Sequence, residues 1–140
     1  MTESFEDYLK QRGLNLKSIH SDEGEIYRGK MMLTSGRCIS FSFLISEGVP
    51  PWINYQIFFE PIITCSHYYL KESVLELLND FNREGQGYYT LLLNRDGQIA
   101  LRTIACAKDY EMIFQVFLSG LRTIEHLDIY LNNENDEGDV

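Results

Sequence analysis

Apolar and polar residues alternate along two stretches in the first half of the chain. Apolar side chains occupy alternate positions in residues 38–45 and again in residues 53–60, as Ile39, Phe41, Phe43 and Ile45 and as Ile53, Tyr55, Ile57 and Phe59. Strict alternation predicts two strands that each have one buried face and one wetter face. The segment Gly48-Val-Pro-Pro51 between them predicts a loop, because proline cannot continue a ladder.

Weaker patterns predict two further strands before these, at residues 14–21 and 25–33, joined by a turn at residues 22–24. Gly29 lies inside the second of them. A glycine within a strand indicates a bulge or a close backbone approach.

Helical spacing of apolar residues marks three other segments. The first follows Thr2 or Ser4, either of which could cap it, and ends at Gly13, a typical helix stop. The second spans residues 67–83. The third begins after Asp109 and is predicted to end near Leu131. Their apolar faces are Phe5, Tyr8 and Leu9; Leu70, Val74, Leu77, Leu78 and Phe81; and Tyr110, Ile113, Phe114, Phe117, Leu121 and Ile124.

Asp96-Gly97 is the strongest turn signal in the chain and predicts a hairpin with a two-residue loop. The corresponding register pairs Leu92 with Leu101. It places Leu91, Leu93 and Ile104 on the other face of the hairpin. Both faces are then partly apolar, which indicates a surface for a partner.

These elements predict an α+β fold in which helices pack on one face of an antiparallel sheet. The predicted order is helix, three or four strands, helix, two strands, helix. The length predicts a single domain, residues 1–131. A polar tail follows at residues 132–140 and is predicted to be disordered, because it is rich in acidic side chains and poor in apolar ones.

The net charge of −9 argues against a surface for nucleic acid or for an anionic membrane. No apolar run approaches the ~18 residues of a membrane-spanning helix, and the N-terminus lacks a signal-peptide pattern. The three cysteines are odd in number and widely spaced, so a disulfide framework is not expected. Free thiols fit a reducing cytoplasm.

No residue cluster predicts catalysis, and no metal or other cofactor is expected. Cys65-Ser-His67 is at most half of a zinc site, which needs about four ligands. Gly85-Gln-Gly87 follows a predicted helix rather than a strand, so we interpret it as a helix C-cap. Asp22, Glu23 and Glu25 are interpreted as a solvated turn.

Two regions are candidates for a partner surface. Arg28 and Lys30 share one face of a predicted strand with apolar neighbours, which suits either a peptide or an ordinary solvated face. The last helix is either fully buried or part of a homodimer seam, and Gly120 within it suggests a close packing contact. The predicted partner or dimer contacts are Arg28, Lys30, Phe58, Leu91, Leu93, Ile104, Val116 and Gly120.

The segment from Leu77-Leu-Asn-Asp-Phe-Asn82 through Gly87-Tyr-Tyr-Thr-Leu-Leu-Leu93 to Asp96-Gly97-Gln-Ile-Ala-Leu101 resembles the YbjN family, within the type III secretion chaperone-like fold. Asn79 and Asn82 stand at the matching asparagine positions. The order of elements extends the resemblance to about Leu131. Two features depart from it, namely a fourth strand-like segment before the second helix and the acidic tail.

The resemblance implies a non-enzymatic, cytoplasmic protein that is chaperone-like or regulatory. Secretion chaperones of this fold are usually dimers that hold an extended stretch of a partner, so a homodimer with a protein or peptide partner is expected. Two different functions stay open. One is a small-ligand or enzymatic domain with a pocket between the sheet and the last helix. The other is an acidic immunity protein that neutralises a basic toxin.

Overall fold

The computed structural model describes residues 4–64, 75–76, 78–83, 88–93 and 98–138, with side chains through Leu127 except those of residues 61–64. Its strands form one antiparallel sheet in the order β1-β2-β3-β4-β6-β5. The elements are α1 (Phe5–Gln11), β1 (Ser18–Ser21), β2 (Gly24–Met32), β3 (Cys38–Glu47), β4 (Ile53–Thr64), β5 (Thr90–Leu93), β6 (Gln98–Ala107) and α3 (Tyr110–Gly138). Residues 75–76 and 78–83 are also helical.

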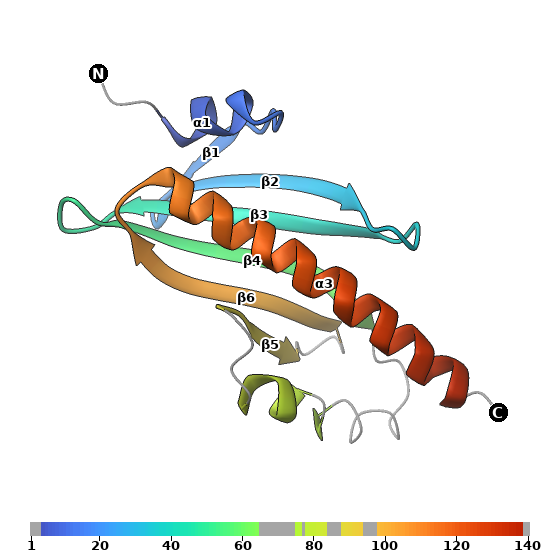
Figure 1. The fold of residues 1–140 in the computed structure, drawn as a ribbon. Helices are drawn as coiled ribbons and strands as arrows, with labels where there is room; N and C mark the ends of the chain where they lie inside the picture. Colours follow the sequence, from blue (N-terminus) through green and yellow to red (C-terminus); the bar gives the residue numbers. More distant parts are fainter. Residues whose placement is uncertain (1–3, 65–74, 77, 84–87, 94–97, 139–140) are drawn as a thin grey trace.

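Helix α3 crosses one face of this sheet diagonally (Figure 1). The predicted α+β fold, an antiparallel sheet with helices on one face, is therefore confirmed. All four segments before residue 65 that resembled strands are strands.

The alternation in β3 and β4 has the predicted consequence. Phe43, Ile57 and Phe59 are completely buried beneath the helices, while Ser42 and Phe58, one position away, are partly exposed. We call the face under the helices the inner face and the opposite one the outer face. The hydrophobic core lies between the inner face and α3.

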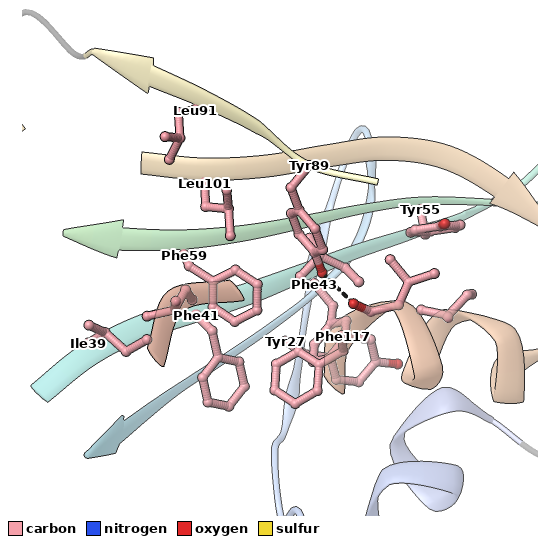
Figure 2. Packing of buried hydrophobic residues seen from close by; sticks show 14 of the residues in the cluster. Tyr27, Ile39, Phe41, Phe43, Tyr55, Phe59, Tyr89, Leu91, Leu101 and Phe117 are labelled. Carbon is pink, nitrogen blue, oxygen red and sulfur yellow. Dashed lines mark hydrogen bonds between the residues drawn. The ribbon is translucent and has the colours of Figure 1, made fainter. Parts of the chain in front are cut away.

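Phe117 of α3 is the centre of an aromatic cluster in this core (Figure 2). Its ring centroid lies 4.8 Å from that of Phe43, 5.1 Å from Phe41 and 5.6 Å from Phe59. Aromatic rings bury large areas and gain further from tilted or stacked contacts. The cluster ties α3 to the two central strands.

Helix α1 closes one end of the core and has the predicted boundaries. The Ser4 Oγ accepts a 3.1 Å hydrogen bond from the Asp7 N–H, and Gly13 has a φ of 86°, which glycine adopts easily. Strand β1 begins at Ser18 rather than at the predicted residue 14. Leu14 instead extends the end of α1, with its N–H donating to the Leu9 carbonyl at 2.9 Å.

The predicted register of the β5–β6 hairpin is wrong by one residue. Leu91 pairs with Leu101 and Leu93 pairs with Ile99, so an odd number of residues separates each pair. A two-residue turn requires an even number. Because side chains alternate, the shift places Leu91 on the inner face. The predicted turn itself lies outside the described residues.

Helix α3 continues beyond its predicted end near Leu131, and its backbone is helical to Gly138. The predicted helix end is therefore wrong, whereas the disorder predicted for the tail stays a prediction. No proline or glycine interrupts the chain between Leu131 and Gly138, and glycine is a common residue at a helix end.

The edge of the sheet at β5 is covered by an asparagine. The Asn82 side chain accepts from the Leu91 N–H at 2.9 Å and donates to the Leu91 carbonyl at 3.1 Å. Both backbone groups of Leu91 are thus satisfied by a side chain that imitates a neighbouring strand. Unpaired edge groups invite pairing with other chains, so this cover protects the edge.

Replacing Asn82 by aspartate is expected to lower the free energy of unfolding by about 1–3 kcal/mol. The aspartate retains an acceptor but loses the donor, and its charge faces the Leu91 carbonyl. Asn79→Asp makes the same charge change at an exposed helical position and is expected to stay within about 0.5 kcal/mol. Urea unfolding measures both. Equal losses would contradict the edge-capping role.

Candidate functional site

The helices described above leave the outer face of the sheet without a covering layer (Figure 1). The register brings its residues together in cross-strand rows. One row contains Arg28, Ser42, Phe58 and Arg102, and the next contains Ile26, Leu44, Gln56 and Ile104. The outer face therefore combines cationic, small and apolar side chains from four strands.

A groove of about 500 Å³ runs over the centre of this face, and we call it the serine groove. The short side chains of Ser40 and Ser42 on β3 form its floor. Longer side chains on the two neighbouring strands form its walls. The wall residues are Arg28 and Lys30 on β2 and Phe58 and Glu60 on β4. The hollow exists because short side chains on β3 lie between longer ones on β2 and β4.

A second hollow of about 400 Å³ adjoins the serine groove across the next row. It is lined by Leu44, Gln56, Ile104 and Cys106, among others. Ile104 is 63% exposed, which is high for a large aliphatic side chain on a sheet. The two hollows lie beside each other on the outer face, and we call them together the strip; its β2 side carries the two cations, and its β6 side carries Ile104.

The serine groove is cationic although the whole chain carries a net charge of −9. Arg28 and Lys30 are exposed, and neither forms an ion pair with any residue in the described part of the chain. Glu60 is the one acidic side chain among the residues that line the groove. The charge of this site thus opposes that of the molecule.

Of the eight predicted contact residues, the structure brings four together on the outer face and places the other four away from it. Arg28, Lys30, Phe58 and Ile104 share the outer face. The other four belong to the inner side, where they are buried or packed against the core. They are Leu91, Leu93, Val116 and Gly120. The hairpin register explains the error for the two leucines.

Val116 and Gly120 have an internal role. The Tyr89 hydroxyl donates a 2.7 Å hydrogen bond to the Val116 carbonyl (Figure 2). A Cβ atom on Gly120 would lie 2.6 Å from the Tyr89 ring and 2.7 Å from the Phe59 ring. The predicted close contact at Gly120 is confirmed, but the neighbour belongs to the same chain.

Burial raises the pKa of Tyr89 well above its usual value of 10.0, and raises that of Tyr27 to about 12. The folded state therefore holds these protons more tightly than the unfolded state. Their contribution to stability is complete below pH 10 and declines as the pH rises above it.

Above pH 10 we expect Tyr89 alone to lower the free energy of unfolding by up to about 1.4 kcal/mol per pH unit. Tyr89→Phe should remove that part of the slope. Tyr88→Phe, at the exposed neighbouring position, should leave it unchanged. Urea unfolding between pH 9 and pH 11.5 measures the slopes. The same slope in wild type and Tyr89→Phe would contradict the burial of an ionisable hydroxyl.

Sequence reasoning missed several residues of the outer face, among them Ser40, Ser42, Leu44 and Glu60. The signal was present in the alternation, which places serines at successive outward positions of β3. A run of small residues on the central strand of a bare face indicates a groove when both neighbouring strands carry large ones.

The described residues offer little for catalysis. None of them form a group of three histidine, cysteine or acidic side chains that could hold a metal. The two hollows contain Cys106 and Glu60 in separate places and no histidine. Cys38 and Cys106 are free thiols, whereas Cys65-Ser-His67 and Gly85-Gln-Gly87 lie outside the described residues.

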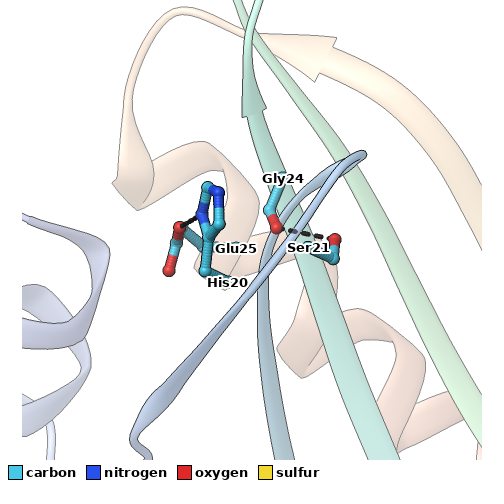
Figure 3. Close-up of polar contacts among 4 residues, drawn as sticks. All are labelled: His20, Ser21, Gly24 and Glu25. Atoms are coloured by element: carbon cyan, nitrogen blue, oxygen red, sulfur yellow. Dashed lines mark hydrogen bonds and ion pairs between the residues drawn. The ribbon is translucent and has the colours of Figure 1, made fainter.

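Another polar cluster lies at the β1–β2 turn (Figure 3). The His20 Nδ1 lies 2.5 Å from Glu25 Oε1, and the Ser21 Oγ donates to the Gly24 carbonyl at 2.8 Å. The hydrogen bond with His20 lowers the pKa of Glu25. The His20–Glu25 contact is exposed and the Ser21–Gly24 bond is partly buried; both link residues across the same turn, which they stabilise.

No protein-family model matches this sequence, and the search of curated proteins found no match either. Among the helices in the described ranges, none combines the length and apolar character needed to cross a membrane.

Proposed function

We propose that this protein is a non-enzymatic, cytoplasmic protein-binding module with a chaperone-like or regulatory role, which holds a segment of a protein partner on the outer face of its sheet. The observation that carries the proposal is the uncovered strip formed by the serine groove and the hollow around Ile104. A solvated sheet face needs neither an exposed isoleucine nor a groove with two cations on one wall.

The composition of the strip suits an extended peptide. Extended segments bind to sheets through side-chain pockets at alternate positions. The strip supplies such pockets in neighbouring rows, over Ser42 and beside Ile104. The long stems of Arg28 and Lys30 add apolar surface beneath their charges.

The resemblance to the YbjN family supports the same function. Asn82, one of its matching residues, caps the sheet edge at β5. This cover makes strand addition at the β5 edge less favourable.

A small-ligand or enzymatic domain receives less support, because the two hollows are open and lack a catalytic pair. An immunity protein for a basic toxin would need an acidic contact surface. The walls of the serine groove instead carry Arg28 and Lys30, so the charge of the strip favours a different kind of partner.

A photo-crosslinking residue at position 104 tests the proposal in cells. We expect discrete protein adducts from this position, because Ile104 is 63% exposed within the strip. The same residue at position 111, exposed on α3, serves as the control. Adducts should weaken when Phe58→Ala alters the neighbouring wall. Equal or absent adducts at both positions would contradict the assignment of the outer face.

We also propose a homodimer, as the family resemblance implies. Val116 and Gly120 are buried within one chain, so a seam would have to use other residues. Light scattering across salt and protein concentration measures the molar mass. A mass of two chains that resists high salt would support an apolar seam, and a mass of one chain throughout would overturn the dimer.

A further inference from the structure

We propose that the serine groove recognises an acidic, extended peptide, in which carboxylates at alternate positions contact Arg28 and Lys30 and a neighbouring apolar side chain enters the strip. This inference rests on the proposed protein-binding function and names the chemistry of the partner. Its basis is a groove with two cationic side chains in a protein whose net charge is negative.

The spacing of the two cations matches an extended chain. Arg28 and Lys30 are two residues apart on β2 and exposed on the same face. Residues two apart on a strand are separated by roughly 7 Å, and the same repeat separates alternate side chains of an extended peptide. A peptide that lies along β2 can therefore place one carboxylate at each cation.

The cations are available for such a contact. Neither has an ion-pair partner among the residues for which the structure gives side chains. Arginine and lysine bind carboxylates by charge-assisted hydrogen bonds, which are stronger than neutral ones. Strand β1 pairs with β2 only as far as Tyr27. The groove wall can thus be reached from the sheet edge as well as from its face.

The groove also offers a place for an apolar anchor. Phe58 stands opposite Arg28 across Ser42, and Leu44 and Ile104 follow in the next row. Because alternate side chains of an extended peptide point the same way, an aliphatic or aromatic side chain two residues beyond the carboxylate at Arg28 can enter this part of the strip. Arg102, paired with Phe58, adds a third cation beyond this position.

A nucleic acid fits these observations less well than a peptide. Its backbone carries a dense row of charges, and the net charge of −9 opposes a long polyanion over the whole molecule. A short acidic segment engages the local cations and meets little of the remaining surface. The apolar hollow beside the groove has no counterpart in a phosphate backbone.

Selection from a phage library of random twelve-residue peptides tests the inference on the full chain. Three proteins are compared: wild type, R28E/K30E and K10E/K17E. Each double variant lowers the net charge by 4, from −9 to −13. Lys10 and Lys17 are exposed and lie away from the groove, so the second variant controls for overall charge.

We expect wild type and K10E/K17E to enrich peptides with two acidic residues at alternate positions and an apolar residue at the next alternate position. A synthetic enriched peptide, followed by fluorescence anisotropy, should bind R28E/K30E about tenfold more weakly or worse. Its affinity for K10E/K17E should stay within about twofold, and salt should weaken the binding. Thermal unfolding confirms that each variant is folded, and R28Q/K30Q replaces the reversal if it is not.

The outcomes separate the two proposals. Enriched peptides without acidic residues, or peptides that bind R28E/K30E as tightly as wild type, would overturn the acidic-peptide inference and leave the protein-binding function standing. No enrichment on any of the three proteins would overturn both. Displacement of the peptide by oligouridylate or inorganic phosphate at lower concentrations than by free peptide would assign the groove to phosphate and overturn the inference.

Discussion

Replacing Phe117 by alanine is expected to lower the free energy of unfolding by about 3–5 kcal/mol. The ring is 2% exposed and contacts three aromatic rings from β3 and β4 together with one from its own helix. Truncation removes the transfer free energy of the ring and leaves a cavity that the surrounding strands cannot fill. Because a domain of this size is stable by only about 5–15 kcal/mol, the variant should be close to unfolding at 37 °C.

Two controls separate the loss of packing from the loss of an aromatic residue. Phe117→Leu keeps most of the side-chain volume and leaves only a small cavity. It should therefore lower the free energy of unfolding by less than about 1.5 kcal/mol. Phe58→Ala also removes a phenyl ring, but from the partly exposed outer face. It should lower the free energy of unfolding much less than Phe117→Ala does. Urea unfolding by circular dichroism gives all three values. Equal losses for Phe117→Ala and Phe58→Ala would show that the core is not organised around Phe117.

Gly120→Ala is expected to destabilise the protein by about 1–3 kcal/mol, although alanine favours a helix over glycine by about 1 kcal/mol. The new methyl group would lie 2.6 Å from the Tyr89 ring, whose hydroxyl is held by the Val116 carbonyl. Neither the ring nor the helix backbone can move without loss of that hydrogen bond. Overpacking therefore outweighs the gain in helix propensity.

A double-mutant cycle identifies the neighbour that causes the loss. Tyr89→Leu shortens the side chain, so Gly120→Ala should cost less in that background than in wild type. Gln115→Ala, at an exposed position of the same helix, should change stability by no more than about 0.5 kcal/mol. A stabilising Gly120→Ala would mean that α3 stands further from the sheet than the structure shows.

The sequence predicts the order of elements and the two faces of β3 and β4, because these depend on local periodicity. Alternation identifies Phe43 and Phe59 as buried, and Ser4 and Gly13 mark the ends of α1. Such signals lie within a few residues of the structure they determine. For that reason the fold class follows from the chain alone.

The hairpin register and the contact surface do not follow from the sequence in the same way. Asp96-Gly97 favours a two-residue turn locally, but burying Leu91 opposite Leu101 selects the other register. Leu91 and Val116 are apolar whether they face a partner or their own core, and the positions of α3 and of the helical residues 75–76 and 78–83 decide between these. The groove arises from three strands, so no single stretch predicts it.

The role of Asn82 also depends on a residue that is remote from it in the sequence. It precedes Leu91 by nine positions, with the end of a helix and a connection between them. Its amide makes two hydrogen bonds with one backbone position, which no sequence pattern within the helix indicates. Only the paired geometry shows why an asparagine is suited to that position.

The strand order also constrains how the chain can be made. Strand β6 pairs with β4 along its length, from Ile53 with Ala107 to Thr64 with Gln98, and both are central in the finished sheet. During synthesis, however, β1 to β4 leave the ribosome first, and β4 is then an edge strand with an uncovered apolar face. In the described part of the chain, β6 closes that edge, and α3 completes the cover of the face. A chain that stops before Gln98 is therefore expected to aggregate, and the nascent protein depends on its last third for protection.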